Sequence, residues 1–149
     1  MSIEIDQSGK VEQLSTNTVV ALANDYSCAI LITTSSKRRL FIKLRGSKVP
    51  RNVLYPWIFS ILIFLALKQL KTFPNTLIID EEYTGKDKII KDSLLKLTLK
   101  IKPKWNGEIR FKQVGKLSPS HKLAWSVHNK TSKVKFLKTN VIEIMRYLI

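Results

Sequence analysis

The chain has 149 residues, of which 44% are hydrophobic and 25% are charged, and this length and composition suit one globular domain. Its single cysteine, Cys28, excludes a disulfide within the chain and a cysteine-based zinc cluster. The 26 Lys and Arg outnumber the 11 Asp and Glu, so the formal net charge is +15 and we expect an anionic partner, foremost a nucleic acid.

The first quarter of the chain has the β-branched, alternating pattern of an antiparallel sheet. The predicted strands are residues 3–6, 11–14, 18–23 and 28–33. Turn signals at residues 7–10 and 24–25 separate them. The N-terminus lacks the basic start and long apolar stretch of a signal peptide, so we expect a cytoplasmic, reducing location and an inert Cys28 in the core.

A basic segment follows the predicted sheet. A helix over residues 37–45, capped by Ser35 or Ser36, is expected from the apolar spacing, and a strand over 39–44 is the alternative. Residues 36–51 contain seven basic residues and no acid, which favours contact with a phosphate backbone. The predicted nucleic-acid contacts are Lys37, Arg38, Arg39, Lys43, Arg45, Lys48 and Arg51, with Lys116 and Lys122 later in the chain.

The most apolar segment is residues 53–67, which contain no charged residue. Fifteen residues are fewer than the roughly 20 that span a bilayer, so we predict a buried helix ending near residue 70. Pro56 is tolerated in its first turn. The alternatives for this helix are a homodimer interface or a membrane-surface or scaffold role, in which the positive charge would meet anionic lipid.

Strands and helices alternate in the remainder of the chain. The predicted elements are a strand at 76–80, a helix at 86–100, a strand at 108–114, a helix from Ser118-Pro119 to 128, a basic loop at 129–138 and a helix at 141–149 capped by Thr139 or Asn140. An antiparallel unit followed by such alternation predicts an α/β fold, a mixed five-stranded sheet flanked by helices in a single domain over residues 1–149.

Three segments carry a resemblance to a known group of proteins. They are Ile5-Asp6-Gln7-Ser8-Gly9 on the opening strand, Leu77-Ile78-Ile79-Asp80, and the late helix that begins Ser118-Pro119-Ser120-His121. Together with the order of elements, they resemble the ribonuclease H-like (retroviral integrase-like) superfamily, which includes ribonuclease H and RuvC-type resolvases. The resemblance implies a divalent-metal-dependent nuclease whose third ligand comes from the late helix, here His121. The sequence departs from ribonuclease H itself, because residues 53–67 hold no acid where that enzyme has a catalytic glutamate.

The candidate ligands can also be argued from strand geometry. If residues 3–6 and 76–80 are parallel neighbours, Asp6 and Asp80 lie about 4.8 Å apart at the carboxyl ends of their strands. Two carboxylates at that spacing share a proton or hold Mg²⁺ or Mn²⁺. Glu82 is the reserve metal ligand on the same face. The alternatives are a turn-shaping role for Asp6, solvent-exposed acids at Asp80 and Glu82, and an exposed first-turn position for His121.

Other chemistries are excluded by what the chain lacks. Its five glycines show no phosphate-cradling spacing, and it contains neither G-x-S-x-G nor a zinc signature, so no nucleotide cofactor is expected. Trp57 and Trp125 are predicted in the core, whereas Trp105 is the tryptophan expected to meet a base, with the anchoring of a loop as the alternative. The two leading hypotheses are a metal-dependent nuclease acting on structured or duplex nucleic acid and a catalytically inactive ribonuclease H-like module that only binds it.

Overall fold

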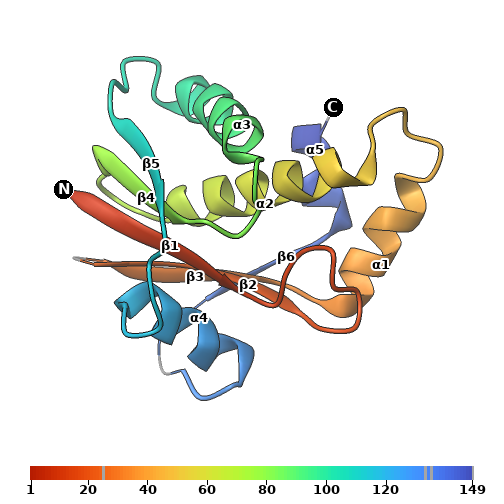
Figure 1. The fold of residues 1–149 in the computed structure, drawn as a ribbon, viewed down its shortest axis with the longest axis horizontal. Helices are drawn as coiled ribbons and strands as arrows, with labels where there is room; N and C mark the ends of the chain where they lie inside the picture. The colour runs from red at the N-terminus through yellow and green to blue at the C-terminus, as the bar shows by residue number, and fades with distance from the viewer. Residues whose placement is uncertain (25, 133, 135, 149) are drawn as a thin grey trace.

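The computed structural model describes residues 1–24, 26–132, 134 and 136–148. Within these ranges a six-stranded mixed sheet is surrounded by five helices (Figure 1). The strands are β1 (Ser2–Ser8), β2 (Thr18–Asn24), β3 (Ser27–Ile32), β4 (Thr76–Asp80), β5 (Glu108–Lys112) and β6 (Leu137–Thr139). Their order across the sheet is β5-β4-β1-β2-β3-β6. The first three strands form an antiparallel meander, β4 and β5 extend it parallel to β1, and β6 pairs in parallel with β3.

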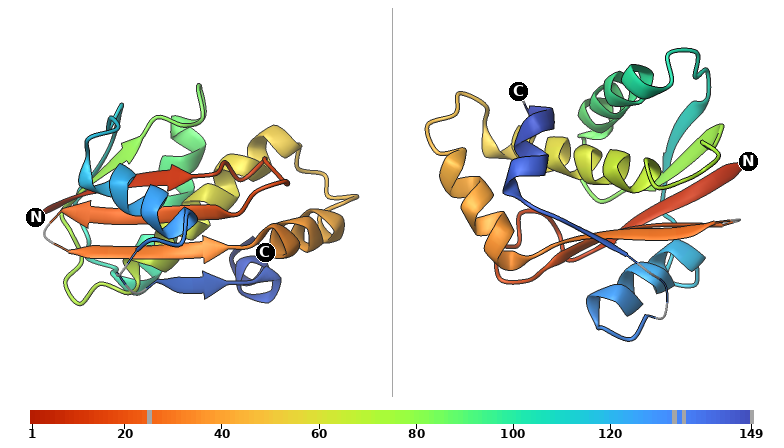
Figure 2. Two further views of the ribbon diagram at one scale, coloured as in Figure 1. Left: turned by 90° about the horizontal axis from the view of Figure 1, so that it is seen from below. Right: turned by 180° about the vertical axis from the view of Figure 1, so that it is seen from behind.

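The helices cover both faces of the sheet. They are α1 (Thr34–Lys43), α2 (Arg51–Leu67), α3 (Asp87–Ile101), α4 (Pro119–His128) and α5 (Val141–Leu148). Helices α2, α3 and α5 lie on one face and α4 lies on the other, whereas α1 lies at the end of the molecule away from the N-terminus (Figures 1 and 2). The α4 face of the sheet is therefore covered by a single short helix.

Alternation along the strands divides the core between the two faces. On β2, Val20 and Leu22 join the large cluster beneath α2, whereas Val19, Ala21 and Ala23 face α4. The α4 face is lined largely by alanine, and these small side chains let the helix approach the sheet closely. Residues of β1 that pair with this set across the strands, including Asp6 opposite Ala21, point to the α4 side.

Helix α2 accounts for the long apolar run. Twelve of its residues are buried, and the cluster beneath the helix contains both sheet and α3 side chains. Burial on all sides explains why the helix is apolar around its whole circumference. The part of the chain that the structure describes contains no helix of the length and apolar character needed to cross a membrane.

Several predicted elements differ in detail from the structure. Residues 11–14 form turns rather than a strand, because β1 pairs directly with β2 and leaves no free sheet edge there. The segment after the β3 strand is helical, as predicted, but Thr33 is its N-cap and accepts a hydrogen bond from Ser36 N. The predicted count of five strands is wrong, since the basic loop at 129–138 ends in the short strand β6.

The remaining elements are present, although α2 ends at Leu67 rather than near residue 70 and holds Pro56 inside the helix rather than in its first turn. Ser118 caps α4 with Pro119 in its first turn, and the Asn140 side chain caps α5. Cys28 is buried, and burial raises the pKa of its thiol to about 11. The turn predicted at residues 24–25 includes Asp25, which lies outside the described residues, as do Lys133 and Lys135 of the predicted basic loop and Ile149 of the predicted last helix.

Candidate metal centre

Asp6 and Asp80 lie side by side on the two central parallel strands. Their strands pair in parallel with Ile5 opposite Ile79, so the next residue on each strand is an aspartate. Both carboxylates point to the α4 face, because the residues before them, Ile5 and Ile79, belong to the core on the other face. Parallel pairing, which the sequence predicted, therefore brings two carboxylates together at the centre of the sheet.

Glu82 completes a group of three acids. One carboxylate oxygen from each of Asp6, Asp80 and Glu82 lies within 4.8 Å of the others. Burial, a hydrogen bond shared with Asp80, and the negative charges of Asp80 and Asp6 raise the pKa of Glu82 to about 8. Burial and the Asp80 charge also raise the pKa of Asp6, which is only 2% exposed. The cluster therefore concentrates more negative charge than the protein alone can keep ionised.

His121 contacts the acidic cluster from helix α4. The Ser118 cap starts α4 with its first turn over β1, and His121 Nδ1 lies 2.8 Å from Asp6 Oδ2. This contact lowers the pKa of Asp6, against the stronger effect of burial. The His121 side chain is 37% exposed, whereas Asp6 beneath it is buried. His121 therefore stands between the acidic cluster and solvent.

Backbone and side-chain hydrogen bonds hold the acids in place. The N–H of Gln7 donates to Asp6 Oδ1 over 2.8 Å, and the N–H of Val114 donates to Asp80 Oδ1 over 2.8 Å. Tyr83, next to Glu82, is buried, and its hydroxyl donates to Gln7 Oε1 and accepts from the N–H of Val11. These bonds join the chain after β4 to the chain after β1, so the cluster is built on anchored segments.

A hollow of about 310 Å³ opens beside Glu82. Its wall includes Lys10 and Lys86. Asn52 and Tyr55, from the start of α2, also line it. Neither lysine was among the predicted contacts. Lys10 lies in the loop after β1 and Lys86 lies in the turn before α3. Only the fold brings both lysines to the hollow beside Glu82.

Most of the predicted basic contacts are exposed. Arg38, Arg39, Lys43, Arg45, Lys48, Arg51, Lys116 and Lys122 are all on the surface. Lys37 is an exception, because it is fully buried and its ammonium donates to Lys10 O, Gln13 O and Thr18 Oγ1. Its prediction as a nucleic-acid contact is therefore wrong: Lys37 fastens α1 to the loop after β1.

The structure favours the loop-anchoring alternative for Trp105 and corrects the prediction for Trp125. Trp105 donates its ring N–H to Pro74 O over 2.8 Å and packs edge-on against Phe73, so it anchors a loop. Trp125, which was expected in the core, is 55% exposed on α4. The residue pattern could have indicated this, since Leu123, Ala124 and Val127 already supply the buried face of that helix.

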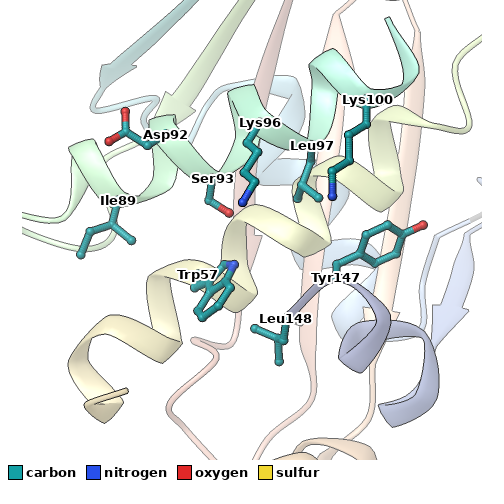
Figure 3. Close-up of a pocket in the computed structure, with 9 residues that line it drawn as sticks. All are labelled: Trp57, Ile89, Asp92, Ser93, Lys96, Leu97, Lys100, Tyr147 and Leu148. Atoms are coloured by element: carbon teal, nitrogen blue, oxygen red, sulfur yellow. The ribbon is translucent and has the colours of Figure 1, made fainter. Parts of the chain in front are cut away.

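A second concavity lies away from the acids, between α2, α3 and α5 (Figure 3). Its volume is about 410 Å³. Trp57 and Tyr147 form one side, and Lys96 and Lys100 extend toward them from α3. None of its lining residues belongs to the acidic cluster, so the candidate chemistry and this apolar groove are separate.

Comparison of the chain with protein-family models gave no match, and comparison with curated proteins gave none. The features that bear on function are therefore the charge of the surface and the geometry of four residues, Asp6, Asp80, Glu82 and His121.

Proposed function

We propose that this chain is a ribonuclease H-like, divalent-metal-dependent nuclease that acts on structured or duplex nucleic acid. The observation that carries the proposal is the convergence of three carboxylates within 4.8 Å, with His121 bonded to one of them. These residues come from two adjacent strands, the chain after β4, and α4. Convergence of distant segments on one acidic cluster is typical of a catalytic centre rather than of a solvated surface.

The arrangement of strands supports the ribonuclease H-like assignment. That group was inferred from an antiparallel unit followed by alternating strands and helices, and the strands β5-β4-β1-β2-β3 follow such an order. Its acids were expected at the ends of the first strand and of the strand after the long helix. Asp80 ends β4, whereas β1 continues to Ser8, so Asp6 lies two residues before the end of its strand. The sixth strand adds to the edge next to β3, far from the acids in the sheet order, and leaves the site unchanged.

The donor set fits a hard divalent cation. Carboxylate oxygens are the ligands that Mg²⁺ and Mn²⁺ prefer, and Asp6, Asp80 and Glu82 would hold the ion. The raised pKa of Glu82 indicates that the cluster lacks a compensating positive charge. When bound, such an ion polarises a phosphate and makes water a stronger nucleophile near neutral pH.

His121 would act as a positioning residue that orients one carboxylate of the cluster. An ionised Asp6 only accepts hydrogen bonds, so His121 would donate to it through Nδ1, which leaves Nε2 on the side of the ring away from Asp6. The ring is partly exposed, so its Nε2 edge is open to solvent or to a substrate. Asp6 fixes the tautomer and the orientation of His121.

The surrounding charge supports a nucleic acid as substrate. The net charge of +15 attracts phosphate backbones and releases their counterions. Lys10 and Lys86 line the hollow beside Glu82, together with the acid Glu12, so two cations lie in the wall next to the cluster. A substrate phosphate would meet cations from the protein on one side and the metal-binding cluster on the other.

A catalytically inactive module that binds nucleic acid is the second candidate. One observation favours it: among the described residues the acidic cluster contains three carboxylates, and α2 contributes none where ribonuclease H has a glutamate. The scaffold or membrane-surface hypothesis loses its motivating observation, because the core accounts for the apolar sequence of α2.

Cleavage assays on labelled duplex DNA, an RNA–DNA hybrid and a four-way junction test the proposal, each with Mg²⁺, Mn²⁺ or EDTA. We expect metal-dependent cutting that falls at least about 100-fold in Asp6→Asn and Asp80→Asn. Both substitutions keep an oxygen that can accept the existing backbone hydrogen bond. Asp92→Asn, at an exposed acid paired with Lys88 on α3, is the matched control and should cut like the wild type.

Two other outcomes are decisive. Tight, salt-sensitive binding without cutting of any substrate would replace the nuclease by the inactive module. Cutting that persists in both Asp6→Asn and Asp80→Asn would remove the acidic cluster from the mechanism.

A further inference from the structure

Trp125 is the most exposed tryptophan of the chain, with 55% of its surface accessible. A large aromatic side chain exposed to this extent leaves apolar surface in water that a partner can cover. Its helix is firmly placed, because Leu123, Ala124 and Val127 pack on the sheet and Asn129 bonds back to Trp125 O through both its N–H and its side-chain amide. The exposed ring therefore projects from a rigid support.

The position of Trp125 relates it to the candidate metal centre. It follows His121 by four residues on α4, so both side chains lie on the same face of the helix, about 6 Å apart along its axis. His121 contacts Asp6 of the acidic cluster. Trp125 is thus one helical turn from the residue that borders the site.

The charge around Trp125 points to the chemistry of its ligand. Residues 113–132 contain Lys116, Lys122 and Lys130 and no acid, and these three lysines are exposed. An apolar protein partner would need no such charge, whereas a nucleotide combines an aromatic face with a phosphate. Aromatic rings beside lysines are the usual means of binding single-stranded nucleic acid.

We infer that Trp125 stacks on an unpaired nucleobase next to the scissile phosphate, so that the preferred substrate has single-stranded nucleotides at the cleavage site. The inference rests on the proposed function and narrows its substrate class. In an intact duplex the faces of the bases are hidden in the stack, so only an unpaired or extruded base can lie on the indole. Substrates of this class are overhangs, gaps and junctions with open nucleotides.

Binding measurements in EDTA test the inference without cleavage. The probes are a fluorescently labelled, fully paired hairpin duplex and the same hairpin with a single-stranded overhang, measured by anisotropy. We expect Trp125→Ala to weaken binding of the overhang about 5- to 100-fold and to leave the paired hairpin within about twofold. Trp125→Phe should recover most of the loss, because the aromatic face is kept.

Two further readouts distinguish stacking from a general effect. Binding of the overhang should quench tryptophan emission in the wild type and quench it less in Trp125→Phe. Ile142→Ala, which removes an exposed apolar side chain on α5 at the other face of the sheet, is the matched control and should bind both probes normally.

Different experimental outcomes would overturn the stacking role of Trp125 and the proposed nuclease function. Equal binding of the overhang by wild type and Trp125→Ala would overturn the stacking role and leave the nuclease proposal intact. An equal loss on both probes would also overturn it, since the indole would then not select unpaired bases. Failure of the wild type to bind either probe would overturn the proposed function and this inference together.

Discussion

His121 Nδ1 lies 2.8 Å from Asp6 Oδ2, although 115 residues separate the two along the chain. The contact joins the start of α4 to the central strand of the sheet. It depends on the small side chains Ala21, Ala23 and Ala29 beneath α4, which let the helix lie close to β1 and β2. The pair links the only described helix on this face to the acids of the candidate metal centre.

His121→Ala should weaken Mn²⁺ binding by about 10- to 100-fold, because a partner that orients a metal-binding carboxylate contributes that much to affinity. Titration calorimetry measures the affinity directly. His128→Ala is the control: His128 also lies on α4, but its ring bonds to Thr16 Oγ1 and Ser8 O rather than to an acid. An unchanged Mn²⁺ affinity in His121→Ala would separate His121 from the site.

Without metal, the free energy of unfolding should fall as the pH rises from about 5 to about 8. The pKa of Glu82 is raised from 4.5 to about 8 by folding, so in this window the folded chain retains a proton that the unfolded chain has released. The stabilisation is therefore fully present below pH 4.5 and lost as the pH passes 8. The raised pKa of Asp6 acts in the same direction.

Chemical denaturation in EDTA across this pH range measures the effect. Added Mn²⁺ should reverse the fall, because the cation binds the deprotonated acids. Glu82→Gln should flatten the pH dependence, whereas Glu81→Gln, at the exposed neighbouring acid, should retain it. A flat profile in the wild type would show that the three carboxylates are not crowded.

Lys37 and Lys43, both on α1, should respond in opposite ways to substitution. Lys37→Met should lower the free energy of unfolding by about 2–4 kcal/mol, because it leaves buried acceptors on Lys10, Gln13 and Thr18 without their donor. Lys43→Gln should leave stability unchanged and reduce the slope of log K against log salt by about 0.9 for duplex DNA. Chemical denaturation measures the change in stability, and a free energy of unfolding equal to that of the wild type in Lys37→Met would contradict a structural role for Lys37.

Gly9→Ala should destabilise the chain by about 2 kcal/mol or more. Gly9 has a φ of +75°, and an added Cβ would clash with Asn17 O and approach His128 Cε1. Gly85→Ala is the matched control, because Gly85 has a φ of +74° with no atom near the added Cβ, and it should cost about 1 kcal/mol. Thermal or chemical denaturation compares the two, and equal losses would mean that the close approach at Gly9 is relieved.

Local patterns were sufficient for most of the fold. Ser118-Pro119 predicted the start of α4 because a cap and a fixed φ act within one turn, and the apolar residues 53–67 predicted a buried helix because composition alone requires burial. The parallel neighbours of Asp6 and Asp80 were also predictable, since few sheet topologies accommodate this order of elements. Strand β6 was missed because three residues in a basic loop carry too little pattern.

The environment of each side chain could not be predicted without the tertiary structure. Lys37 and Lys43 are indistinguishable in the sequence, yet one is buried with three acceptors and the other is exposed, because burial depends on the loop that α1 contacts. For the same reason, Trp125 is exposed although the core was expected, and Trp105 bonds to Pro74 O instead of lying free on the surface. The sequence by itself determined the candidate acids and the positive charge, which are properties of residue type and spacing. Only the tertiary structure decided which of these groups meet, because contacts between distant segments depend on how the helices pack against the sheet.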